Sequence, residues 1–316
     1  MSEHLTRTLA AMTDVDVDVL LLGRSPNVRY VSGANQLALA GTRPFAPACV
    51  VVRGSGALHL MTTTDEGVPR DIPHDHFYST SWNPMTIVGR VAAIPGVTTA
   101  RRIGVDGMTP LMDRLLRGAL GELELVDGEA LLRNVRRVKS DADLDGLRGA
   151  LTIARHALDA VREVLRPGVS EIELKAAFER GMAGHGATSP SVEGRFNSLF
   201  PGDGALAKGE LVPVRAGLIA DGWEGTVATT FVCADPPIER ESRLDDVLEQ
   251  CRPGRSVGNV RDAADGVTVD GVGMGHEALA DGDVLEPGMT LAIERFAGDV
   301  LSGATVVVTP SGHDAL

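Results

Sequence analysis

The sequence predicts an α/β domain followed by an α+β domain. Three observations predict this: short apolar runs alternate with a helical stretch up to about residue 138, two amphipathic helices then follow one another directly, and strand-like runs return after Pro190. A chain of 316 residues is long enough for two domains with substantial cores. We predict the domain boundary near residues 138–140, which gives domains of residues 1–138 and 139–316.

The first domain shows short apolar runs bounded by Gly, Asp and Arg. The strands predicted from these runs are 18–23, 48–54, 57–62, 101–107 and 123–128. Between the last two lies a helical stretch, residues 109–121, with Thr109 as its N-cap and Pro110 at its first position. Strands separated by a helix are typical of an α/β arrangement.

The second domain opens with two helices. After Ser140, apolar residues step by three and four positions from Leu144 to Leu165, which predicts a helix with one buried stripe. The Pro167-Gly168 pair ends it. Ser170 and Glu173 then form a capping box that starts the second helix.

Hairpin strands are predicted beyond Pro190. The strand-like runs are 209–219, 226–233, 289–296 and 304–312, and the helical runs between them are 242–251 and 257–265. Helices followed by hairpins, twice over, favour curved antiparallel sheet backed by helices.

Composition excludes several classes of protein. The formal net charge of −13 and the absence of a Lys/Arg cluster disfavour a nucleic-acid partner. No basic N-terminal region precedes an apolar stretch, and the apolar runs are too short to span a membrane, so we expect a cytoplasmic protein with no membrane partner. The three cysteines lack paired-ligand spacing, which predicts buried free thiols.

Four short motifs occur in a recognisable order. They are "SPNVRYVSG" (25–33), the "RRVKS" helix entry within 131–150, "LRPGVSEIEL" (165–174) and "LEPGMTLAIE" (285–294). On these motifs the chain resembles the creatinase/aminopeptidase P/prolidase superfamily, whose catalytic domain has the pita-bread fold. The resemblance implies a creatinase-type N-terminal domain, a shortened pita-bread domain and a homodimer.

The resemblance also implies where metal ligands would fall. Family peptidases bind two divalent metals through two Asp, one His and two Glu, because such cations need several carboxylates. Carried over residue by residue, these ligands fall on Arg215, Thr226, Val272, Glu294 and Gly303. Only Glu294 is a ligand type, and Arg215 brings positive charge, so we expect no metal and no other cofactor.

The remaining polar residues define the predicted site. We expect Glu294 and His276 to transfer protons, His276 because an imidazole titrates near neutrality. Arg215, Glu277, Glu224 and Thr226 are expected to bind substrate. For Arg215 with Glu294 two hypotheses stay open: an ion pair that fills the vacated metal position, or a clamp for a charged substrate.

These residues lead to a functional hypothesis. It is a metal-independent, creatinase-like hydrolase or lyase that cleaves a C–N bond of a small polar metabolite. The alternative is a catalytically inactive homologue that acts as a binding or assembly protein, and an Xaa-Pro metallopeptidase is less favoured. The "HDH" run (74–76) is expected to be solvated, and "GVGMG" (271–275) lacks the helix of a dinucleotide site.

Overall fold

The computed structural model describes residues 2–35 and 48–316, and the chain divides into two compact units, residues 1–136 and 137–316. Each unit combines sheets with helices, as the sequence predicts. None of the helices in the described residues is both long and apolar enough to cross a membrane.

The N-terminal unit is built on a six-stranded mixed sheet with the strand order β4-β3-β2-β1-β5-β6. Its strands are β1 (Val19–Leu22), β2 (Cys49–Val52), β3 (Ala57–Met61), β4 (Phe77–Tyr78), β5 (Arg102–Val105) and β6 (Glu124–Asp127). The strands β1, β5 and β6 run parallel, whereas β1, β2 and β3 form antiparallel pairs. All five strands predicted for this domain are confirmed.

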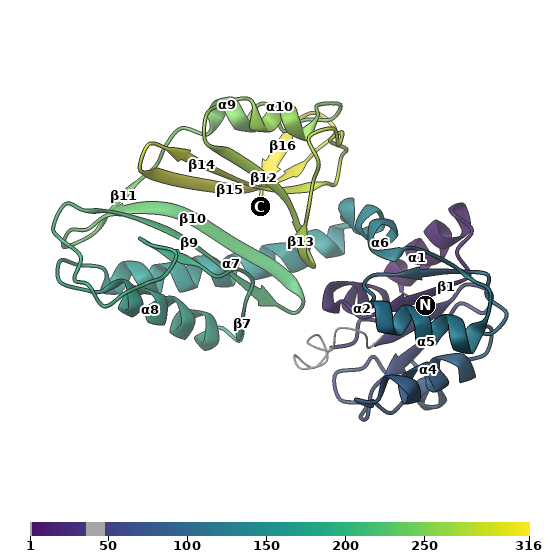
Figure 1. Ribbon diagram of the computed structural model, residues 1–316. Coiled ribbons are helices and arrows are strands. Elements are labelled where there is room, and N and C mark those ends of the chain that lie inside the picture. Colours follow the sequence, from purple (N-terminus) through teal and green to yellow (C-terminus); the bar gives the residue numbers. More distant parts are fainter. Residues whose placement is uncertain (1, 36–47) are drawn as a thin grey trace. The chain divides into compact units, whose positions relative to one another are not determined.

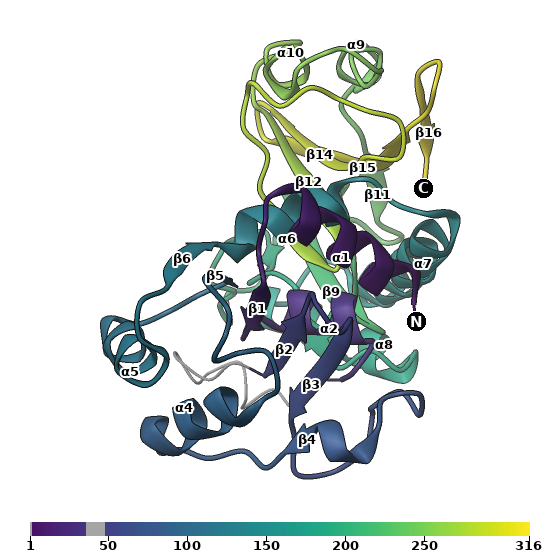
Figure 2. The ribbon, with the colours of Figure 1, turned by 90° about the vertical axis from the view of Figure 1, so that its right-hand side faces the viewer.

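Helices pack on both sides of this sheet. They are α1 (Glu3–Asp14), α2 (Ser25–Ser32), α4 (Pro84–Ala93), α5 (Pro110–Leu120) and α6 (Gly128–Arg137). Apolar side chains of α4 and α5 join one face of β1, β2 and β5 in a single core, and Figure 2 shows α1 and α2 on the opposite side. Thr109 accepts a hydrogen bond from the Met112 amide, which confirms the predicted N-cap of α5.

The C-terminal unit contains two five-stranded sheets that face one another (Figure 1). The first consists of β7 (Ser189–Pro190), β8 (Arg195–Phe196), β9 (Leu211–Ala220), β10 (Trp223–Val232) and β11 (Ile238–Arg240). The second consists of β12 (Val267–Gly273), β13 (Gly275–Glu277), β14 (Thr290–Ala297), β15 (Val300–Val308) and β16 (His313–Ala315). The second sheet has the order β13-β12-β14-β15-β16.

Two long helices, α7 (Asp141–Val164) and α8 (Glu171–Gly184), cover the outer face of the first sheet. Capping boxes at Ser140 with Asp143 and at Ser170 with Glu173 start them. The second box is the one predicted. The contact of α7 with β10 needs a glycine at 225, because a Cβ there would lie 2.3 Å from the Ala150 carbonyl oxygen.

Two short helices, α9 (Asp245–Leu248) and α10 (Val257–Arg261), cover the outer face of the second sheet. The prediction of a helix over 242–251 is therefore wrong in its length. The helix begins late because the Ser242 amide donates to the Ser302 hydroxyl at 2.7 Å, which holds that residue against β15. It ends early because the amides of Gln250 and Cys251 donate to carbonyls three residues back, which replaces the α-helical pattern with tighter turns.

Thr230 joins the two sheets. Its hydroxyl donates to the Leu301 carbonyl at 2.9 Å and accepts from the Leu301 amide at 2.8 Å, and Thr230 is fully buried. A buried hydroxyl that satisfies both a donor and an acceptor fixes β10 of the first sheet against β15 of the second. The three cysteines are free and buried, as predicted.

The "HDH" run forms a 3-10 turn in the N-terminal unit, and the ring of its last residue packs against a buried histidine at a tilt. The rings of His59 and His76 lie 4.3 Å apart, whereas the His74 side chain is 78% exposed. Burial, and then the neighbouring His76, lower the pKa of His59 to about 4 against a smaller opposing effect from Asp75. His59 therefore stays neutral in the folded chain at pH values where it is protonated in the unfolded chain.

This histidine predicts a pH dependence of stability. Between the ordinary pKa of about 6.5 and the folded value, only the unfolded chain binds the proton, so stability falls as pH falls. The free energy of unfolding falls by up to about 3 kcal/mol over this pH range. His59→Leu should flatten this dependence, and His74→Leu should not. Calorimetry at about pH 7.5 and about pH 5 tests it, and equal drops in Tm for wild type and His59→Leu would contradict it.

Candidate functional site

Arg215 and Glu294 form an ion pair between the two sheets of the C-terminal unit. On β14, Leu291 and Ile293 belong to the core beneath α9 and α10, so Glu294 points the opposite way, toward the first sheet. Arg215 Nε donates to Glu294 Oε1 at 2.6 Å and to Oε2 at 2.7 Å. The two residues lie on facing strands of different sheets, β9 and β14.

The ion pair leaves most of the guanidinium unused. Its Nε–H is the only donor with a partner among the described residues, and the Arg215 side chain is 37% exposed while Glu294 is 17% exposed. Both terminal nitrogens of Arg215 therefore remain available to a ligand. A guanidinium offers five donors in a planar fork, so one carboxylate at Nε does not saturate it.

A second arginine, Arg195, lies on the neighbouring strand β8, directly opposite Arg215. In the pairing of β8 with β9, Arg195 is opposite Arg215, so both side chains lie on the face that Glu294 approaches. The Arg195 guanidinium carbon lies 5.6 Å from the ring centre of Phe296, which is two residues beyond Glu294 on β14. Arg195 was not predicted as a site residue, because a two-residue strand such as β8 carries no periodicity.

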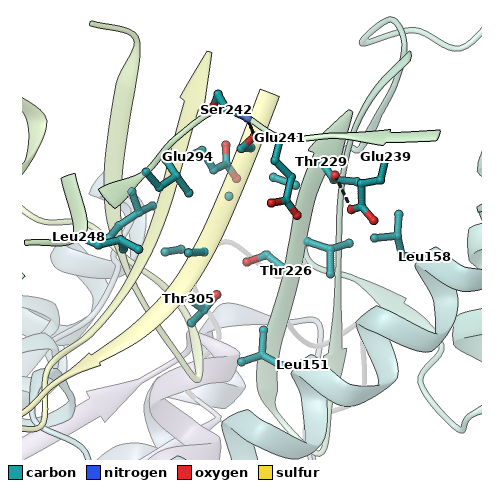
Figure 3. Close-up of a pocket in the computed structure, with 18 of the residues that line it drawn as sticks. Leu151, Leu158, Thr226, Thr229, Glu239, Glu241, Ser242, Leu248, Glu294 and Thr305 are labelled. Atoms are coloured by element: carbon teal, nitrogen blue, oxygen red, sulfur yellow. Dashed lines mark hydrogen bonds between the residues drawn. The ribbon is translucent and has the colours of Figure 1, made fainter. Parts of the chain in front are cut away.

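Glu294 also lines a cavity of about 590 Å³. Its polar and charged lining residues include Arg155, Thr226, Thr229, Glu239, Glu241, Arg243, Asp245, Glu294 and Thr305. Figure 3 shows the Glu241 carboxylate turned toward the centre of this group, and it has no hydrogen bond or ion pair among the described residues. Arg243 pairs with Asp245 at 3.3 Å. The carboxylates outnumber the cations, so the cavity favours a cationic group.

Thr226 and Thr229 occupy this cavity in different ways. Thr226 is half-buried opposite Gly217 in the hairpin of β9 and β10, and its hydroxyl has no hydrogen-bond partner among the described residues. Thr229 is buried and donates to Glu239 Oε1 at 2.7 Å. Thr226 is thus the site threonine open to a ligand. Arg215 does not line this cavity, although it touches Glu294, which does.

Glu277 and Glu224 are both buried. Glu277 Oε2 accepts from Lys139 Nζ at 2.6 Å, and the two side chains are 3% and 1% exposed. Glu277 Oε1 has no hydrogen-bond partner in the part of the chain that the structure describes. Glu224 lies in β10 and is 5% exposed. The side chain of His276 lies outside the described part of the structure; its backbone pairs with Val272 in the β12–β13 hairpin.

Two matches to protein families decide the relationship. The Creatinase/Prolidase N-terminal domain matches residues 4–138, and Metallopeptidase family M24 matches residues 145–309. The chain belongs to metallopeptidase family M24. This confirms the resemblance and the pita-bread fold inferred from the sequence motifs.

Some relatives of this M24 chain are similar over nearly its whole length and others over about half of it. An Xaa-Pro dipeptidase of Pyrococcus horikoshii is 23% identical and covers 100% of this chain and 97% of its own. The crystal structure of the prolidase from Pyrococcus horikoshii has a TM-score of 0.78 at 18% identity, covering 99% of this chain and 97% of that one. A creatinase of a Bacillus species is 27% identical over 55% of this chain and 42% of its own.

The buried Lys139–Glu277 pair predicts a test of stability. Lys139→Met leaves an uncompensated carboxylate in the interior and should destabilise the protein by about 3–5 kcal/mol. The double variant with Glu277→Met leaves no buried charge and should be clearly less destabilised. Thermal unfolding of the three proteins provides the measurement.

The exposed pair of Lys175 with Glu179, 3.9 Å apart, offers a matched control. Lys175→Met should cost less than about 1 kcal/mol, because solvent screens such pairs. Equal stability of Lys139→Met and Lys175→Met would show that the buried pair contributes nothing.

Proposed function

We propose that this M24 protein is a metal-independent hydrolase that cleaves a C–N bond in a small zwitterionic molecule of dipeptide size. The observation that carries the proposal is the Arg215–Glu294 pair, which puts a guanidinium against the one carboxylate retained from the expected ligand set. The names of the relatives, Xaa-Pro dipeptidase and prolidase, favour a peptide-like substrate over the broader class of polar metabolites.

The residues present do not fit a two-metal centre. The Arg215 guanidinium places a positive charge where a cation would need to bind, and Val272 contributes a buried apolar side chain. At Gly303 a Cβ would lie 2.7 Å from the Ala228 Cβ, so a ligand side chain has no room there. The donor set and the packing both oppose divalent metal binding, and no step of the proposed reaction uses one.

Glu294 is the proposed general base. It lines the cavity, and the Arg215 hydrogen bonds fix its carboxylate in place. In the proposed reaction Glu294 takes a proton from water, the water oxygen attacks the carbonyl carbon, and the C–N bond breaks as the proton returns to the leaving nitrogen. His276 is the proposed second proton-transfer group.

Charge on the two sides of Glu294 supports a zwitterionic substrate. The cavity carries Glu239 and Glu241 without compensating cations of their own, and these suit an ammonium or amine group. Arg215 lies on the other side with free donors for an anion. Thr226 is the proposed hydroxyl contact to the substrate between them, and Glu224 and Glu277 are proposed to shape the binding site.

A catalytically inactive binding protein is the second candidate. The specific observation in its favour is that both oxygens of Glu294 accept from a single Arg215 nitrogen, so the carboxylate is already engaged in an ion pair. In that case the site binds the same class of ligand without turning it over. The expected homodimer and cytoplasmic location are compatible with either candidate.

The metal content of the purified protein tests the proposed metal independence. We expect the purified protein to contain clearly less than one Mn, Co, Zn or Fe per chain by elemental analysis, because guanidinium charge repels cations. Arg215→Asp should give a larger Mn²⁺-induced rise in Tm than wild type, since it replaces that charge with a second hard oxygen ligand. Stoichiometric metal in wild-type protein would refute metal independence.

Dipeptide turnover tests the proposed hydrolase activity and the role of Glu294. Wild-type protein incubated with an Xaa-Pro dipeptide mixture and a chelator should release free amino acids, measured by mass spectrometry. Glu294→Gln should lower the rate by about 10²-fold or more, the usual contribution of a general base. Arg162→Gln, an exposed change on α7, is the matched control and should keep full activity.

The alternatives give distinct results in the same assay. Dipeptides that raise Tm but are not consumed would favour the inactive binding protein. Equal rates for wild type and Glu294→Gln would remove Glu294 from the mechanism.

A further inference from the structure

We propose that Arg195 and Arg215 together form a binding site for a substrate carboxylate, with Arg195 as a substrate-binding residue of this site. The inference rests on the proposed function for the identity of the substrate, but binding can be measured without turnover. Three features of the two arginines support it: their register, their unused donors and their fixed positions.

The register places two like charges opposite each other. Arg195 and Arg215 are direct partners in the antiparallel pairing of β8 and β9. Like charges directly opposite in a sheet destabilise it. Glu294 compensates the charge of Arg215. The Arg195 guanidinium lies over the face of the Phe296 ring and has no carboxylate partner among the described residues, so its positive charge stays uncompensated. A bound carboxylate would remove this imbalance.

Unused donors are present on both side chains. Arg215 uses its Nε–H, and Arg195 uses one Nη1–H, which donates to the Asn197 carbonyl at 3.2 Å. The other N–H groups have no partner among the described residues. Guanidinium forks match the two oxygens of a carboxylate, so the pair can bind one bidentately.

Arg195 is held in position by the segment that follows it. Asn197 adopts a left-handed conformation with φ of 76°, and its side chain donates to Glu171 at 2.8 Å and to Glu210 at 3.1 Å. Burial raises the pKa of Glu171, but hydrogen bonds from Ser198, Gly202 and Asn197 outweigh it, and the pKa lies below its usual value. Glu171 is therefore a charged anchor, and the Asn197 carbonyl it fixes orients Arg195.

A matched pair of small molecules tests the proposal directly. N-acetylglycine carries an amide and a carboxylate, and N-acetylglycinamide differs only in lacking the negative charge. We expect N-acetylglycine to bind wild-type protein and raise its Tm, and the amide to bind at least about tenfold more weakly. Binding is measured by calorimetric titration, in the Glu294→Gln background as well, so that it does not depend on turnover.

Variants of Arg195 separate ligand binding from folding. Arg195→Gln should weaken N-acetylglycine binding by about tenfold or more, and Arg195→Lys should restore part of it by returning the charge without the fork. Arg162→Gln should bind as wild type does. A solely structural role would lower Tm in Arg195→Gln and leave the affinity unchanged, and that result would overturn the proposal.

Four further outcomes separate the carboxylate site from the proposed hydrolase. Equal binding of the acid and the amide would overturn the carboxylate assignment, as would binding of inorganic phosphate without binding of N-acetylglycine. Dipeptide turnover that is unaffected by Arg195→Gln would refute Arg195 while leaving the proposed hydrolase intact. Carboxylate binding by Arg195 and Arg215 without any turnover would support the site and refute the hydrolase.

Discussion

The ion pair of Arg215 with Glu294 is the interaction on which the rest of the C-terminal unit's chemistry depends. It joins β9 of one sheet to β14 of the other. A guanidinium does not deprotonate in proteins, so the inter-sheet space holds a permanent positive charge. Glu294 then has two tasks, because it compensates Arg215 and also forms part of the cavity wall. Partial exposure of both side chains limits the desolvation penalty that a fully buried pair would carry.

Local signals in the sequence account for the parts of the fold that were predicted. The stripe of apolar residues and the capping box at Ser170 depend on residues within a few positions of each other, and α7 and α8 follow from them. The length of α9 could not be predicted in this way. It depends on the hydrogen bond of Ser242 to Ser302, sixty residues away, which no local pattern encodes.

The same distinction applies to the candidate site. The motifs around Arg215 and Glu294 were enough to predict that the two residues face the same site. Their placement on facing strands of two different sheets was seen only in the structure. Arg195 was missed because its importance comes from a two-residue pairing with β9. The buried contact of Glu277 with Lys139 could likewise not be predicted from the sequence, since the two residues are 138 positions apart.

Packing between the sheets leaves no room for a side chain at residue 303. Gly303 lies opposite Glu294, and it allows β10 to approach until the Ala228 Cβ would be 2.7 Å from any Cβ at 303. Because β10 and β15 lie so close together, the nearby Thr230 hydroxyl can hydrogen-bond both the amide and the carbonyl of Leu301. A glutamate at 303 would therefore have to separate the strands and break these buried hydrogen bonds, which costs on the order of 1–3 kcal/mol per unsatisfied group. The seam between the sheets therefore excludes a ligand side chain at residue 303 and leaves Arg215 and Glu294 as the charged pair between the two sheets.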